Sequence, residues 1–212
     1  MARKIRARIE RTKRVFVPND IQNAAYIFAE TIKEKQQNGG AGILIDGMAC
    51  GIMIAFSFEA NLNFIGFELH RAEKLPDWKE RDLFYDKLKK VFGVLDIPIE
   101  WDKRPMKSVE RMKRLRDGIA HGKPVYGKSD TVEVGTPEEI DIAAADSLAA
   151  GWQVDCNADV LFEAREDVDT LWKLMVEKSG LDLWNTMTSG EGGITYIEDV
   201  DPNTPSTVPP IK

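Results

Sequence analysis

Apolar residues recur every three or four positions through most of this chain, which is the spacing of an amphipathic helix. The first such run follows the helix-start signal Pro18-Asn19-Asp20 and ends at Asn38-Gly39-Gly40. Residues 41–71 then form one run that is apolar on nearly every side. Because neighbours pack such a helix on several faces, we expect residues 41–71 to form a core helix of the fold.

Further helices are predicted along the rest of the chain. They span residues 78–94, 105–120, 136–150 and 157–178. Pro76 opens the first of them, Asn157 caps the last, and Gly180 ends it. Helix after helix with short connections is typical of an all-α antiparallel bundle.

The two ends of the chain do not follow helical spacing. Residues 1–16 alternate basic and apolar side chains, so alternation indicates a short strand whereas the charge density favours a mobile basic arm. Residues 189–212 are rich in Gly, Pro, Ser and Thr, and a flexible acidic tail is expected there. Residues 125–134 have the pattern of a short β-hairpin. The helical domain is therefore expected to cover residues 17–188.

Composition argues against a disulfide framework, a multi-cysteine zinc site, secretion and a membrane span. Cys50 and Cys156 are too few for a disulfide framework or a multi-cysteine zinc site. We therefore expect two buried, reduced thiols in a cytoplasmic protein, with no metal and no cofactor. The basic N-terminus lacks the apolar stretch of a secretory signal. The longest uncharged run, Gly47 to Phe58, spans about 18 Å as a helix, which is short of a bilayer of about 30 Å.

Charge is unevenly distributed along the chain, whose net charge is −6. Residues 1–130 contain 25 Lys and Arg against 18 Asp and Glu, a net charge of +7. Residues 131–212 contain 4 against 17, a net charge of −13. The basic part suits a polyanionic partner such as RNA. The acidic part either shields that surface, binds a basic partner or keeps the protein soluble.

The chemistry is concentrated in residues 114–122, Arg-Leu-Arg-Asp-Gly-Ile-Ala-His-Gly, at the end of the predicted helix 105–120. Arg116 can hold a phosphate with two parallel hydrogen bonds. His121 can give or take a proton near neutral pH. Lys107, Arg111 and Arg114 follow at i, i+4 and i+7, so they form one basic stripe. That stripe is either a solvated face or a set of phosphate contacts.

This segment resembles the signature of the HEPN domains (higher eukaryotes and prokaryotes nucleotide-binding), an arginine, a polar residue and, a few residues later, a histidine. Arg116, Asp117 and His121 match that pattern, and residues 55–63 resemble the long second helix of these proteins. The resemblance implies a helical bundle over about residues 20–180. It also implies an RNA-cleaving site built by two protomers, with a 2′,3′-cyclic phosphate and a 5′-hydroxyl as product ends.

Geometry gives the remaining site residues their expected roles. Arg116 and His121 differ by about 140° around an ideal helix, so one chain does not aim both at one point unless the helix ends or bends at Gly118. Asp117 shares a face with His121 and is expected to orient its ring. Glu59 interrupts an apolar run, so we expect it to be buried and paired with the motif helix, with Arg116 as candidate partner. A supporting catalytic role for Glu59 is the alternative.

Two functions from different classes follow. The first is a metal-independent endoribonuclease of toxin or antiviral-defence type that works as a homodimer. The second is a non-catalytic HEPN-like module that dimerises or docks a partner protein. A cognate antitoxin, a sensor or an ATPase is the kind of partner expected for either, and no membrane is expected.

Overall fold

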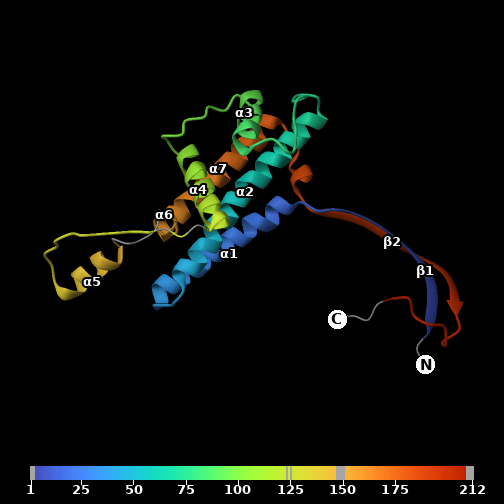
Figure 1. Cartoon of the computed structure of the whole chain (residues 1–212). Coiled ribbons are helices and arrows are strands. Elements are labelled where there is room, and N and C mark those ends of the chain that lie inside the picture. Colours follow the sequence, from blue (N-terminus) through green and yellow to red (C-terminus); the bar gives the residue numbers. More distant parts are fainter. Residues whose placement is uncertain (1–2, 123, 125, 147–150, 209–212) are drawn as a thin grey trace. The chain divides into compact units, whose positions relative to one another are not determined.

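The computed structural model describes residues 3–122, 124, 126–146 and 151–208, and it is mainly α-helical (Figure 1). The helices are α1 (Val17–Asn38), α2 (Ile43–Arg71), α3 (Phe84–Val94), α4 (Met106–His121), α5 (Pro137–Asp146), α6 (Gly151–Asp155) and α7 (Ala158–Ser179), with a short 3₁₀ helix at Leu183–Thr186. Strands β1 (Lys4–Arg14) and β2 (Ser189–Val200) pair in an antiparallel sheet. The chain divides into two compact units, residues 17–185 and residues 1–16 with 186–212.

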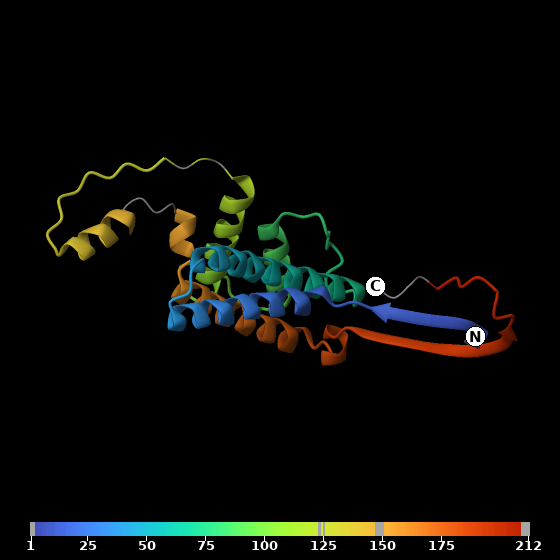
Figure 2. The ribbon, with the colours of Figure 1, turned by 90° about the horizontal axis from the view of Figure 1, so that it is seen from below.

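Helix α2 is the central helix of the larger unit, as its all-round apolar sequence predicts. It packs against α1, α3, α4, α6 and α7. Figure 2 shows α1 and α2 side by side and running in opposite directions. Its buried side chains include Phe58, Leu62 and Ile65. One side of α2 stays in solvent, where Phe56 and Phe67 are 39% and 56% exposed, so neighbours cover several of its faces but not all.

Length and composition would allow α2 to cross a membrane, and among the described helices it alone has this property. The uncharged run from Gly47 to Phe58 is therefore shorter than the apolar part of this helix, and its length does not exclude a membrane span. A helix at the centre of a helical bundle has the same length and composition, so the property does not distinguish the two cases.

Several predicted helix ends are confirmed by their caps. The Asn157 Oδ1 atom accepts a hydrogen bond of 3.0 Å from the backbone N–H of Asp159 at the start of α7. Gly180 ends α7 in the left-handed conformation. Thr136 and Glu139 bond each other's backbone N–H at the start of α5, as a capping box does. The predicted continuation of that helix over residues 147–150 lies outside the described residues.

The helix predicted over residues 78–94 begins later than expected, at Phe84. Trp78 is only 8% exposed, and a Cβ at Gly66 of α2 would lie within 2.6 Å of its ring. Lys90 bonds the carboxylate of Asp82 and the backbone carbonyl of Asp77. Tertiary packing of the indole against α2 therefore fixes residues 78–83 as turns in place of the predicted helical turn.

The smaller unit corrects the prediction for the chain ends. Residues 189–200, expected to belong to a flexible acidic tail, form strand β2, and residues 4–14 form its partner (Figure 2). Ile9 lies opposite Ile194, and Arg6 pairs with Glu198 across the strands. Arg3 bonds Asp199 at 2.6 Å and lowers the pKa of that carboxyl. Strand pairing and cross-strand ion pairs therefore hold the N-terminal and C-terminal segments together.

The predicted hairpin near residues 125–134 is not formed, since no strand occurs among the described residues of that segment. Tyr126, Val132 and Val134 are each at least 93% exposed. A short strand pair with nothing to pack against is marginal in water, which explains the difference.

Candidate functional site

Helix α4 carries the Arg/His motif and is held by its apolar side. Val109, Met112 and Leu115 are at most 3% exposed, and α4 packs on α2, α6 and α7. The helix continues through Gly118 and ends after His121, where Gly122 adopts the left-handed conformation with φ 47°. The bend at Gly118 that would bring Arg116 and His121 together in one chain is therefore absent from this helix.

Arg116 lies between α4 and α2 and is held by two carboxylates. Its Nη2 atom donates a hydrogen bond of 3.0 Å to Glu59 Oε2. Its Nε atom lies 3.0 Å from Asp117 Oδ1, an ion pair without hydrogen-bond geometry. The guanidinium also covers the ring of Phe56 at 5.8 Å. The side chain remains 23% exposed, although its Nε atom is buried.

Glu59 has the partner that the sequence predicted, but it is less buried than expected. Its side chain is 27% exposed. Burial alone therefore does not force this carboxylate to be protonated or paired. The ion pair with Arg116 mainly fixes where the guanidinium points, because it joins two helices across 57 positions of sequence.

Asp117 does not orient His121, which corrects the prediction. It accepts a hydrogen bond of 2.5 Å from Lys113, one turn earlier, and lies beside Arg116. No hydrogen bond joins Asp117 to His121. A lysine at i−4 provides a cation for the carboxylate on the same face of the helix. Asp117 is therefore a second anchor for Arg116.

His121 is the last residue of α4 and is exposed. In the part of the chain that the structure describes, its ring has no hydrogen-bond or ion-pair partner. An unbonded imidazole at a helix end can reach a substrate or a second protein chain without breaking an existing contact.

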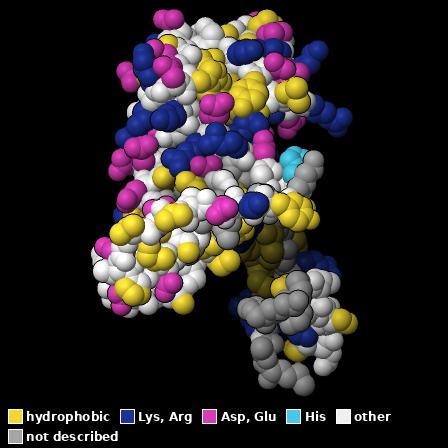
Figure 3. Space-filling view, turned by 60° about the vertical axis from the view of Figure 1, so that its left-hand side comes forward, with side chains coloured by type: hydrophobic (Ala, Val, Ile, Leu, Met, Phe, Trp, Pro, Cys, Tyr) yellow, Lys and Arg dark blue, Asp and Glu magenta, His cyan; other side chains and the backbone are white. Residues whose placement is uncertain are grey.

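The basic stripe is partly neutralised. Lys107, Arg111 and Arg114 line one hollow of about 440 Å³, as their spacing predicts. The Arg111 Nε atom lies 2.5 Å from the buried carboxylate of Asp155 in α6, and Arg114 approaches the same group at 3.5 Å. Blue and magenta side chains accordingly interleave over the face in Figure 3. Arg111 therefore has a structural role, and Lys107 is the least engaged cation of the three.

The stripe also lies on a different side of α4 from the motif arginine. Residues 111 and 116 differ by about 140° around the helix, and residues 114 and 116 by about 160°. Arg116 does not border the hollow that the other three cations line. The stripe therefore does not continue the surface around Arg116 within one chain.

A third polar cluster was not predicted. Arg104 holds Asp167 of α7 through three hydrogen bonds of 2.9 to 3.1 Å, and Ser108 donates a bond of 2.6 Å to the same carboxylate. Asp167 is 6% exposed. It is next to Val168 on the buried side of α7. A carboxylate in the apolar stripe of this helix is the sequence feature that could have predicted the network. This network joins α4 to α7 and is structural.

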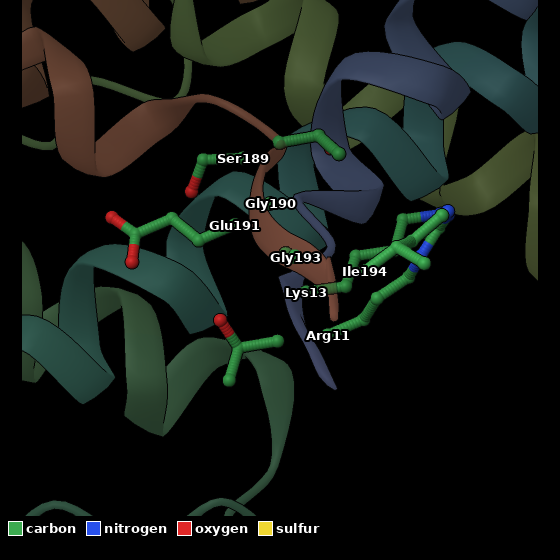
Figure 4. Close-up of a pocket in the computed structure, with 10 residues that line it drawn as sticks. Arg11, Lys13, Ser189, Gly190, Glu191, Gly193 and Ile194 are labelled. Atoms are coloured by element: carbon green, nitrogen blue, oxygen red, sulfur yellow. The ribbon is translucent and has the colours of Figure 1, made fainter. Parts of the chain in front are cut away.

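The glycine-rich segment Gly190–Gly193 is part of β2. It borders an open hollow of about 500 Å³ in the two-stranded unit (Figure 4). Gly192 lies opposite Arg11, and Gly190 lies opposite Lys13. Arg11 and Lys13 project from one side of the strand pair, and Glu191 projects from the other (Figure 4).

Comparisons with protein-family models, with curated proteins and with solved structures found no match. Among the described residues, no three His, Cys, Asp or Glu side chains come together as a metal-binding group would. The functional argument therefore rests on the residues of the site.

Proposed function

We propose that this protein is a metal-independent endoribonuclease with a HEPN-like helical bundle, in the cytoplasm, whose active site is completed by a second copy of the chain. The observation that carries the proposal is the pair on α4. Arg116 is hydrogen-bonded to Glu59, ion-paired with Asp117 and 23% exposed, and His121 ends the same helix exposed and without a side-chain partner among the described residues.

The second copy is needed because α4 is continuous between the two residues. Arg116 and His121 point about 140° apart, so the arginine of one chain and the histidine of the other are better placed to share a substrate. Helix α2 supplies a surface for such pairing. Ile45, Phe56 and Phe67 are exposed and lie eleven residues apart, which is three turns, so they form one apolar line. Phe56 lies directly under Arg116.

The proposed reaction is an internal transfer within RNA. His121 takes the proton from a ribose 2′-hydroxyl, and the 2′-oxygen attacks the adjacent phosphorus as the bond to the 5′-oxygen breaks. The leaving oxygen takes up a proton, which yields a 2′,3′-cyclic phosphate and a 5′-hydroxyl. Arg116 stabilises the charge on the phosphate oxygens, and Glu59 and Asp117 keep its guanidinium in place. Lys107, with Arg114, contacts flanking phosphates.

One observation favours the alternative, a non-catalytic HEPN-like module. Glu59 and Asp117 together offset the charge of Arg116, and Asp155 does the same for Arg111. In that case the α4 residues hold helices together, and the surface binds a protein such as an antitoxin, a sensor or an ATPase.

Cleavage of single-stranded RNA in EDTA separates the two functions. We expect wild type to cleave RNA but not DNA of the same sequence. His121→Ala and Arg116→Ala should each lower the rate by about 10²–10³. His70→Ala is the matched control, because His70 bonds the backbone of Leu75 at the far end of α2. Equal rates for wild type and His121→Ala, or no cleavage by wild type, would favour the binding module.

Mixing the two inactive variants tests the composite site. In a heterodimer of Arg116→Ala with His121→Ala, one of the two shared sites has both groups intact. Random mixing should therefore restore about a quarter of wild-type activity. No restoration, in a sample shown to contain heterodimers, would place both groups of each site in one chain.

A further inference from the structure

A partly open cavity lined by polar and apolar residues lies between α1, α2 and α7, apart from the Arg/His motif. Its volume is about 240 Å³. Ser57 of α2 and Arg165 of α7 supply polar groups, and Ile54 and Val168 form an apolar wall. Tyr26 of α1 stands at the cavity, 49% exposed. All of these residues belong to the larger unit.

Two polar atoms of this cavity are buried without a partner. Ser57 is 1% exposed, and its hydroxyl has no hydrogen-bond partner among the described residues. The Nε atom of Arg165 is likewise buried and unbonded. An unpartnered buried polar group costs free energy, and nearly all such groups in folded proteins find a partner. Both atoms belong to residues that line one cavity, which points to a bound molecule that accepts a hydrogen bond from each.

The charge of Arg165 is available to that molecule. Tyr26 covers the guanidinium with its ring at 5.3 Å but does not neutralise it. Asp169, which also lines the cavity, is engaged by Lys173 at 2.6 Å and by Gln22 at 3.3 Å. The cavity is therefore lined by a hydroxyl and by a planar cation that has no ion-pair partner among the described residues.

We infer that this cavity binds a small organic acid. The carboxylate lies against the guanidinium of Arg165 and accepts the Ser57 hydroxyl, because a carboxylate matches the two parallel donors of arginine. A short apolar body lies on Ile54 and Val168. The volume is below the roughly 300–1,000 Å³ of sites for drug-sized ligands, which limits the occupant to a molecule of metabolite size.

Titration of the full-length protein with acetate, butyrate and benzoate tests this assignment, with benzyl alcohol and inorganic phosphate as matched probes. Benzyl alcohol keeps the ring and lacks the charge, whereas phosphate keeps the charge and lacks the apolar body. We expect saturable binding that is tighter for butyrate or benzoate than for acetate, and at least tenfold tighter than for either matched probe. Two-dimensional NMR should show the shifts at Tyr26 and Ser57.

Arg165→Met should weaken binding of the acids at least tenfold, because it removes a charge-assisted pair of hydrogen bonds. Ser57→Ala should weaken it a few-fold without lowering Tm, since the hydroxyl has no partner in the unliganded fold. His121→Ala should bind as wild type does, whatever its effect on RNA. No saturable binding of any of the three acids, equal binding of benzyl alcohol, or shifts confined to other residues would overturn the assignment. If Arg165→Met does not fold, Arg165→Lys, which keeps the charge and loses the paired donors, decides the same point.

Discussion

Gly51 sets how closely the motif helix approaches the centre of the bundle. A Cβ at this position would lie 2.2 Å from Cδ2 of Leu115 in α4 and 3.2 Å from Cδ2 of Leu161 in α7. Both leucines are fully buried. Gly51→Ala therefore forces Leu115 to move by more than an ångström inside a packed core, and overpacking of this kind costs about 1–3 kcal/mol.

The same substitution has an opposing effect on the helix itself. Alanine is more favourable than glycine in a helix interior by about 1 kcal/mol. The net destabilisation expected for Gly51→Ala is therefore about 0–2 kcal/mol. Gly118 of α4 is the matched control, because it is exposed and a Cβ there meets nothing within 4 Å. Gly118→Ala should raise stability by up to about 1 kcal/mol.

Urea unfolding of both variants measures the difference, which should be about 1–3 kcal/mol because the gain in helix propensity is common to both. A double-mutant cycle with Leu115→Ala identifies the cause. Leu115→Ala leaves a cavity next to residue 51, so Gly51→Ala in that background should be neutral or stabilising. If Gly51→Ala is as stabilising as Gly118→Ala, or remains equally costly without the leucine side chain, the steric argument is wrong.

Two further predictions concern the cysteines and the cap of α7. Burial raises the pKa of the Cys50 thiol to about 12 and that of Cys156 to about 11. Above about pH 9 the unfolded chain releases these protons and the folded chain keeps them, so the free energy of unfolding should fall by up to about 1.4 kcal/mol per pH unit and thiol. The fall should be shallower in the Cys50→Ala/Cys156→Ala variant, and an equal slope would contradict the assignment. Asn157→Ala should cost about 1 kcal/mol in denaturant unfolding, because it removes the bond to the N–H of Asp159. Asn157→Asp should keep that bond and the stability, and equal loss in both variants would count against a capping role.

Local pattern was sufficient for most helices of this protein. Apolar spacing predicted α1, α2, α4 and α7, and Asn157 and Gly180 marked the ends of α7, because each signal lies within a few residues of the feature it specifies. The same kind of reasoning placed Lys107, Arg111 and Arg114 on one face, since that relation depends on helix geometry alone.

Contacts between residues distant in sequence were predicted less completely. Glu59 interrupted an apolar run, and that signal was enough to suggest Arg116 as its partner. Asp117 was assigned to His121 by spacing, but Lys113 one turn earlier is the better partner for a carboxylate. The helix start at Phe84 and the role of Asp155 depended on groups from other helices, which spacing along one helix does not reveal.

The sequence by itself determined the helical class of this protein, the central place of residues 43–71 and the position of Arg116 and His121 on one helix. Only the tertiary structure decided that residues 189–200 form a strand with residues 4–14, that Arg116 is anchored by two carboxylates, and that Ser57 and Arg165 line one cavity. The physical reason is the separation along the sequence of the residues that interact. Helical hydrogen bonds join residues four apart and leave a period in the sequence, whereas strand pairing, ion pairs between helices and cavities depend on which surfaces meet after the chain has folded.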